Sequence, residues 1–213
     1  HGRNIKSGLR STQQPVQDEE PEADPPSSEG ERALILKTYN LQHDFDNKLY
    51  TDQTGRFPYT SFKGNQYVMV AYDMHGSNSI FAEPMRNRSA GSMLEAHEAI
   101  ISQLPEGDAR PTMHILDNEC SKELKQAILD NGMAYQLVPP HDHRRNAAEK
   151  AVQIFKDHFV AVLCGTDEAF PVRLWCSLLP QAVVQLNMLR PSTGDPSMSA
   201  FEQLHGPHTY DAH

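Results

Sequence analysis

The sequence has 213 residues, enough for one well-buried domain of ordinary size with additional segments. It contains no run of roughly eighteen apolar residues and no charged-then-apolar leader, which argues against a membrane-spanning helix and a signal peptide. The formal net charge of -9 argues against binding nucleic acid by bulk positive charge, so any such binding requires a local basic patch.

Both ends of the sequence are expected to lie outside the folded domain. Residues 1–31 include the run QPVQDEEPEADPPSSEGE, which is too polar to bury a core and predicts a disordered acidic linker. Residues 32–47 form a transition segment without a clear pattern, and residues 208–213 form a tail. Because the sequence begins with His1 rather than Met, we expect it to be a piece of a longer protein.

Three strands are predicted first. Residues 49–57 (LYTDQTGRF) indicate a short strand that ends at a turn around Gly55, and residues 66–73 (QYVMVAYD) indicate a buried strand. Residues 79–85 (SIFAEPM) indicate a third, in which Pro84 marks the end of the strand or a sheet edge. The short connections between them predict an antiparallel meander.

Strands and helices then alternate. Residues 89–104 predict a helix with Ser89 as its N-cap, and residues 121–132 predict a second helix, from Ser121 to a terminal Gly132. Strands are predicted before and after the second helix, at residues 112–119 (TMHILDNE) and 134–140 (AYQLVPP). Helices that join strands imply parallel crossovers, so the fold class is α/β with a five-stranded mixed sheet flanked by helices.

A long helix follows around residues 148–163. One stripe of it is apolar and predicts the core-facing side, formed by Ala148, Val152, Phe155, Phe159 and Leu163. Glu149, Gln153 and Lys156 share an adjacent polar stripe. The simplest interpretation of Glu149 is a solvated glutamate in the first turn, favoured there by the helix dipole.

Two aspartates change that interpretation. Asp52 lies near the end of the first predicted strand and Asp117 at the end of the fourth, where a carboxylate is costly unless it is solvated, paired or bound to a cation. If these strands are neighbours and the long helix packs at the same end, the two aspartates converge with Glu149. Oxygen ligands of this kind suit Mg²⁺ or Mn²⁺, and two such ions can act on one phosphorus. Asp73 fits a turn residue better, while Asp44 and Asp46 become candidates only if the first strand is shifted.

Cysteine and histidine give no sign of zinc in this segment. Cys120, Cys164 and Cys176 are odd in number and never spaced as C-x-x-C, which is typical of reduced thiols in an intracellular protein. His141 and His143 have no further partner nearby and are interpreted as loop histidines.

Several motifs together resemble the catalytic core of a retroelement integrase, nearest to those of copia-type and gypsy-type LTR retrotransposons. The resemblance covers roughly residues 48–207 and rests on LYTDQTGRF, YVMVAYDMHGSNSIFAEPM, MHILDNE, QLVPPHDHRRNAAEKAVQIFK and LWCSLLPQAVVQLNMLRPSTGDPSMSAFEQLHG. The order of Asp52, Asp117 and Glu149, the Asn118 after the second aspartate and the helix from Trp175 to Asn187 all agree. The apolar stripe of that helix is expected to face the core or a dimer partner, and Pro180 is expected to kink or divide the helix.

The resemblance implies an RNase H-like fold and a magnesium-dependent polynucleotidyl transferase that joins element ends to target DNA. Its implied metal-binding triad is Asp52, Asp117 and Glu149, with two Mg²⁺ or Mn²⁺ ions. The implied DNA contacts are Arg144, Arg145, Lys150, Gln153 and Lys156. It further implies a homo-oligomer that acts on DNA in the nucleus, with no membrane partner.

The sequence also departs from the family. The segment between Asp117 and Glu149 is shorter than in retroviral members, and its loop PPHDHRRNAAE carries prolines and histidines instead of glycine and glutamine. The family's amino-terminal zinc domain and carboxyl-terminal DNA-binding domain are missing from this sequence. Two alternatives stay open: a non-catalytic nucleic-acid-binding or assembly module with the same fold, and an RNase H-type nuclease, which typically has a fourth carboxylate.

Overall fold

The structure is a computed structural model that describes residues 47–117, 120–138 and 145–207. The predicted acidic linker at 1–31, the transition segment up to residue 46 and the tail at 208–213 lie outside the described residues.

Five strands form one mixed sheet in the order β3-β2-β1-β4-β5. β1 pairs with β2 and β2 with β3 in antiparallel fashion, whereas β1 pairs with β4 and β4 with β5 in parallel. This confirms the predicted sheet, with β3 as an edge strand that accommodates Pro84. The strands are β1 (Lys48–Gln53), β2 (Tyr67–Asp73), β3 (Ile80–Met85), β4 (Met113–Asp117) and β5 (Ala134–Val138).

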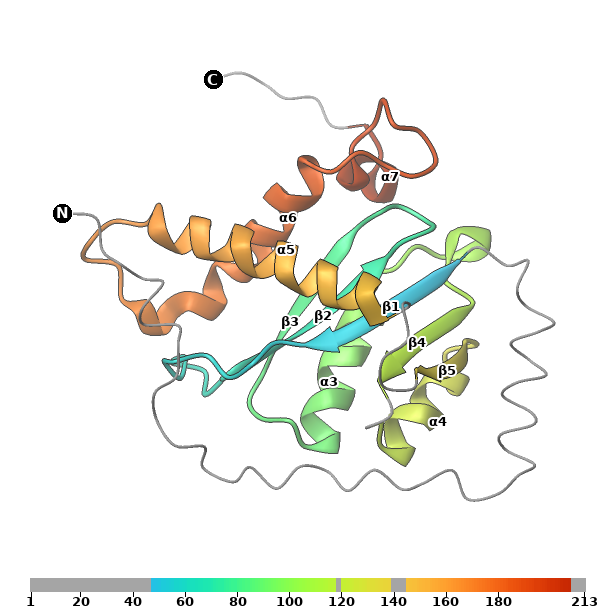
Figure 1. Ribbon diagram of the computed structural model, residues 1–213, viewed down its shortest axis with the longest axis horizontal. Coiled ribbons are helices and arrows are strands. Elements are labelled where there is room, and N and C mark those ends of the chain that lie inside the picture. The colour runs from blue at the N-terminus through green and yellow to red at the C-terminus, as the bar shows by residue number, and fades with distance from the viewer. Residues whose placement is uncertain (1–46, 118–119, 139–144, 208–213) are drawn as a thin grey trace.

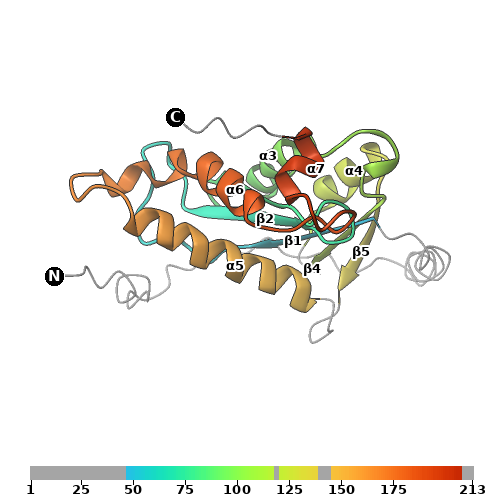
Figure 2. The same ribbon diagram turned by 90° about the horizontal axis from the view of Figure 1, so that it is seen from above.

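Helices cover both faces of the sheet, with α3 and α4 on one side and α5 on the other (Figure 2). The predicted N-caps of α3 and α4 are confirmed, because the Ser89 and Ser121 hydroxyls accept hydrogen bonds from the backbone N–H groups of Ser92 and Leu124. The helices are α3 (Ala90–Ile101), α4 (Lys122–Asp130), α5 (Arg145–Cys164), α6 (Leu179–Met188) and α7 (Ala200–His205), with 3-10 turns η1 (Gly107–Ala109) and η2 (Val172–Ser177).

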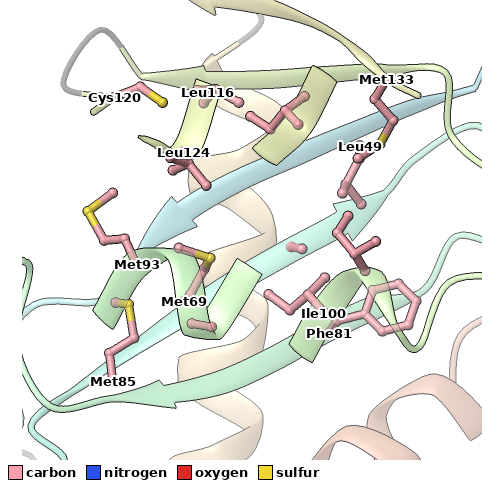
Figure 3. Close-up of a cluster of buried hydrophobic side chains, with 14 of the residues drawn as sticks. Leu49, Met69, Phe81, Met85, Met93, Ile100, Leu116, Cys120, Leu124 and Met133 are labelled. Carbon is pink, nitrogen blue, oxygen red and sulfur yellow. The ribbon is translucent and has the colours of Figure 1, made fainter. Parts of the chain in front are cut away.

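One hydrophobic core lies between the sheet and the pair α3 and α4. Figure 3 shows leucine, isoleucine and phenylalanine side chains there together with several methionines. The sheet contributes alternate positions of each strand, such as Met69 and Ala71 of β2, because successive strand residues point to opposite faces. The helices contribute residues such as Ile100 and Ile128.

A second core lies between the opposite sheet face and α5, η2 and α6. Here β2 contributes the intervening residues Val68 and Val70, which pack with Phe155 and Phe159 of α5 and with Trp175 of η2. The predicted apolar stripe of the long helix is thus its buried side at Val152, Phe155 and Phe159, while Leu163 is half-buried.

Two local predictions are corrected by the structure, and a third is confirmed. The chain does not turn at Gly55 but at residues 61–64, where the Gly64 N–H donates to the Ser61 carbonyl and Gly64 has a φ of 84°. Glu149 is the fifth residue of α5 and so lies in its second turn. As predicted for Pro180, the helix expected from Trp175 to Asn187 is divided: η2 ends at Ser177 and α6 begins at Leu179, with Pro180 in the first turn of α6, where a proline costs no hydrogen bond.

Candidate active site

Asp52 lies on the face of the sheet that α5 covers. In the antiparallel pairing of β1 with β2, Asp52 is directly opposite Val70, and residues so paired share a face. Val70 belongs to the core against α5. The Asp52 side chain is half-buried, and its Oδ1 accepts a hydrogen bond of 2.7 Å from the Gln53 backbone N–H. Asp52 is the last residue but one of β1, which ends at Gln53.

The parallel pairing of β1 with β4 sets the level of Asp117. Lys48 is level with Met113 and Tyr50 with Ile115. The last recorded pair is that of Tyr50 and Ile115, and Asp52 and Asp117 each lie two residues further along their strands. Asp117 is also the last residue of β4 and pairs with Val138 at the end of β5. The two aspartate positions thus lie at the carboxyl ends of neighbouring strands, at the same end of the sheet, although the Asp117 side chain is not among those described.

Glu149 is carried to this region by α5. The helix packs on β1 and β2 through Ala151, Val152 and Phe155, all of them buried. Figures 1 and 2 agree that the amino-terminal end of α5 lies beside β1 and β4. Glu149 is two residues from buried Ala151 and is itself exposed.

The three carboxylates are hard oxygen donors, and their residue types fit Mg²⁺ or Mn²⁺ better than a softer metal. Among the side chains that the structure describes, no group of three or more His, Cys, Asp or Glu is placed to hold a metal ion. Of the three carboxylates, those of Asp52 and Glu149 are among the described side chains. The three carboxylates fit Mg²⁺ or Mn²⁺ by the type of their donor atoms and by the pairing of the strands that carry the two aspartates.

The predicted DNA contacts are only partly described. Lys150 and Gln153 are exposed and Lys156 is half-buried. The Gln153 side-chain amide donates a hydrogen bond of 2.8 Å to Asp157, one turn further along α5. Arg144, His141 and His143 lie outside the described residues, as do Asp44 and Asp46, and of Arg145 only the backbone position at the start of α5 is described.

The comparisons with solved structures bear on the fold. The catalytic core domain of BIV integrase superposes with a TM-score of 0.52 and 16% sequence identity, covering 74% of this chain and 92% of that one. The HTLV-2 integrase catalytic core domain, solved in complex with magnesium in a dimeric form, superposes with a TM-score of 0.52 and 16% sequence identity, covering 76% of this chain and 97% of that one. A chain of the simian T-cell lymphotropic virus intasome in complex with the PP2A regulatory subunit B56 gamma superposes with a TM-score of 0.55 and 15% sequence identity, covering 76% of this chain and 55% of that one.

The chain has the fold of a retroviral integrase catalytic core. That RNase H-like core fold, with its sheet order 3-2-1-4-5, is the one that the sequence resemblance implied. No protein-family model matches the chain, and no curated protein matches it in sequence. In the described part of the chain, no helix is both long and apolar enough to cross a membrane.

Within this integrase-core fold, Asp73 has a structural role, as the sequence predicted. It is buried at the end of β2, and its carboxylate accepts hydrogen bonds from the Gly76 and Ser77 backbone N–H groups and from the Ser77 hydroxyl. This satisfies the carboxylate inside the β2–β3 turn. The three cysteines of the core are free; Cys120 and Cys176 are buried and Cys164 is exposed.

A pair of buried histidines beside the strand of Asp52 was missed by sequence reasoning. His114 of β4 bonds through Nε2 to the hydroxyl of Thr51, the residue before Asp52, at 2.8 Å. Its ring stacks on that of His97 from α3. Burial lowers the pKa of His97 to about 4, and burial followed by the charge of His97 lowers the pKa of His114 well below its usual range. Only the placement of His97 on the buried stripe of its helix, beside Ala96 and Ile100, could have signalled this.

Proposed function

We propose that this chain is the catalytic core of a retroelement integrase of the LTR-retrotransposon kind, a metal-dependent polynucleotidyl transferase that joins element DNA ends to target DNA. The observation that carries the proposal is the parallel pairing of β1 with β4, in which Asp52 and Asp117 each follow the last pair, Tyr50 with Ile115, by two residues. Two acidic residues at neighbouring strand ends repel each other, and a divalent cation offsets that repulsion.

Asp52, Asp117 and Glu149 are the residues that would hold two Mg²⁺ or Mn²⁺ ions in this proposal. When bound, such ions activate a hydroxyl nucleophile and stabilise the charge that develops on the phosphate. Asp52 comes from the rigid centre of the sheet and Glu149 from a helix anchored by Phe155, so both carboxylates are attached to packed elements. Rigid attachment suits a site that must hold its ligands in a fixed arrangement.

The exposed side of α5 supplies the proposed DNA contacts. Lys150 and Lys156 would pair with phosphates, and Arg144 and Arg145 would do so at the start of the helix. Gln153 must give up its bond to Asp157 before its amide can contact DNA. The proposal also includes that the protein forms a homo-oligomer and acts on DNA in the nucleus.

The test is joining of a labelled duplex end to plasmid DNA in the presence of Mg²⁺. Asp117→Asn keeps the side-chain shape and removes a charge, so we expect joining to be lost while DNA binding stays equal or becomes slightly tighter. Glu149→Gln should have the same effect. Glu98→Gln is the matched control, because Glu98 is an exposed glutamate on α3 and its substitution should leave joining unchanged.

Metal binding gives a readout that does not depend on activity. A ligand that binds only the folded state stabilises it by about 2.7 kcal/mol at one hundred times its dissociation constant. Mn²⁺ should therefore raise the melting temperature of the unsubstituted chain and of Glu98→Gln but not of Asp117→Asn. If Mn²⁺ has no effect and Asp117→Asn binds DNA like the unsubstituted chain while neither joins it, the non-catalytic alternative replaces this proposal.

A further inference from the structure

The loop between β1 and β2, residues 54–66, exposes two aromatic rings although its backbone is firmly held. Tyr59 is 57% exposed and Phe62 is 65% exposed. The Trp175 Nε1–H donates to the Tyr59 carbonyl at 2.8 Å, and the Phe62 N–H donates to the Arg173 carbonyl at 2.9 Å. The Arg173 Nε–H also donates to the Thr60 carbonyl at 3.2 Å. Two exposed rings are thus presented by a backbone that η2 fixes in place.

The same loop packs a third aromatic ring, that of half-buried Phe57, against the core, so its exposed rings are not explained by a lack of core. Phe57 stacks on Trp175 with ring centroids 4.3 Å apart and an interplanar angle of 6°. It also meets Phe159 of α5 edge to face at 6.1 Å. The loop therefore separates its aromatic residues into one that anchors it to the core and two that face outwards.

Basic residues accompany the exposed rings in the loop and at Arg173. Arg56 and Lys63 are exposed in the loop, and the Arg173 guanidinium lies 5.4 Å from the centroid of the Phe62 ring. The sequence between Asp52 and Asp73 contains no acidic residue. In a chain with a net charge of -9, this is the kind of local basic patch that nucleic acid requires.

We propose that the β1–β2 loop and Arg173 form a binding surface for single-stranded DNA. Bases stack on Phe62 and Tyr59, and backbone phosphates pair with Arg56, Lys63 and Arg173. Exposed aromatic rings interleaved with cations bind unpaired strands, because every base has a face to stack and every phosphate a charge. The inference rests on the proposed function for its biological setting, since the loop begins two residues after Asp52 in the chain.

Stacking is tested by fluorescence anisotropy with a labelled oligothymidylate and the full 213-residue chain. Phe62→Ala should weaken binding about tenfold, and Phe62→Tyr, which keeps an aromatic face, should bind like the unsubstituted chain. Leu189→Ala is the matched control, because Leu189 is 77% exposed outside the loop and its truncation should change nothing. A far-ultraviolet spectrum and a melting curve of each variant show that the fold is kept.

The cations are tested by the salt dependence of the same binding. Log K falls as log salt rises, and Lys63→Gln should make this slope less steep by about 0.7, the value for one phosphate contact with a single strand. Lys122→Gln, an exposed lysine of α4, is the control and should leave the slope unchanged. A duplex of the same sequence should bind without dependence on Phe62, since its bases are already stacked.

Three outcomes overturn the inference. Oligothymidylate binding that is equal in Phe62→Ala and the unsubstituted chain removes the stacking surface, and equal weakening by Leu189→Ala makes it non-specific. A halved molar mass of Phe62→Ala in light scattering, with DNA binding unchanged, makes the loop an interface between copies of this chain. The proposed function is judged separately, because Asp117→Asn should leave oligothymidylate binding intact: loss of joining without loss of this binding, or the reverse, shows which of the two proposals has failed.

Discussion

The rings of His97 and His114 stack in the core with their centroids 5.2 Å apart and an angle of 13° between their planes. His97 comes from α3 and His114 from β4, and both are almost fully buried. Within the described part of the chain, neither ring nitrogen of His97 and not the Nδ1 of His114 has a hydrogen-bond partner. Protonation of either ring would bury a charge without a partner, so the folded chain favours both rings in the neutral form.

Stability should therefore fall in mild acid. The ordinary pKa of histidine is 6.5 and that of folded His97 is about 4, so the unfolded chain takes up protons that the folded chain refuses. The free energy of unfolding therefore keeps its full value above pH 6.5. It decreases as the pH falls towards 4, by about 1.4 kcal/mol per pH unit for each histidine. Urea unfolding at pH 7.5 and 5.5 measures it. His97→Phe should flatten the dependence, whereas His205→Gln, at the end of α7, should not.

Asn187 of α6 should be important for stability because it completes the hydrogen bonds of an edge strand. Its amide accepts from the Ile80 N–H and donates to the Ile80 carbonyl, both at 2.9 Å, in a buried position. Asn187→Leu leaves two buried backbone groups of β3 without partners and should lower the free energy of unfolding by about 3 kcal/mol. Urea unfolding gives the value. Gln185→Leu, an exposed position on the same helix, is expected to change it by less than about 0.5 kcal/mol, and equal effects would contradict this role.

Trp175 should report on the state of the β1–β2 loop, because it is the only tryptophan of the chain. Phe57 stacks on its ring and Tyr59 accepts its N–H. Phe57→Ala should open the ring to water, shift its fluorescence emission to longer wavelength and lower the free energy of unfolding by about 3 kcal/mol. Phe62→Ala is the comparison within the same loop: Phe62 is mostly exposed, so its truncation should leave the emission maximum in place.

Lys156 of α5 is expected to contact a phosphate of duplex DNA. Lys156→Ala should weaken binding to all sequences alike and reduce the slope of log K against log salt by about 0.9. Salt-titrated binding to two unrelated duplexes measures both quantities. Lys125→Ala on α4 serves as the control for a half-buried lysine. A loss of affinity confined to one duplex would mean that Lys156 reads bases instead.

Local signals in the sequence were sufficient for most elements. Ser89 and Ser121 are good N-caps, and their effect depends only on the next turn of chain, so the starts of α3 and α4 were predictable. The strands were marked by β-branched and aromatic runs such as that of β2. Pro180 likewise acts on its own helix and divides it as expected.

What depends on distant contacts could not be derived in the same way. The loop after β1 turns at residues 61–64 and not at Gly55, because residues more than a hundred positions away, Arg173 and Trp175, hold its backbone. The stacking of His97 on His114 joins a helix to a strand, and only packing reveals that both are buried.

The same distinction applies to the candidate site. The sequence by itself placed Asp52 and Asp117 at strand ends, because the apolar residues before them mark the strands. It could not show that β1 and β4 are neighbours, since strand order is set by pairing between segments more than sixty residues apart. The tertiary structure decided that these strands are parallel neighbours, paired up to Tyr50 and Ile115, with each aspartate two residues further along. The amino-terminal end of α5 lies beside these strands (Figure 1).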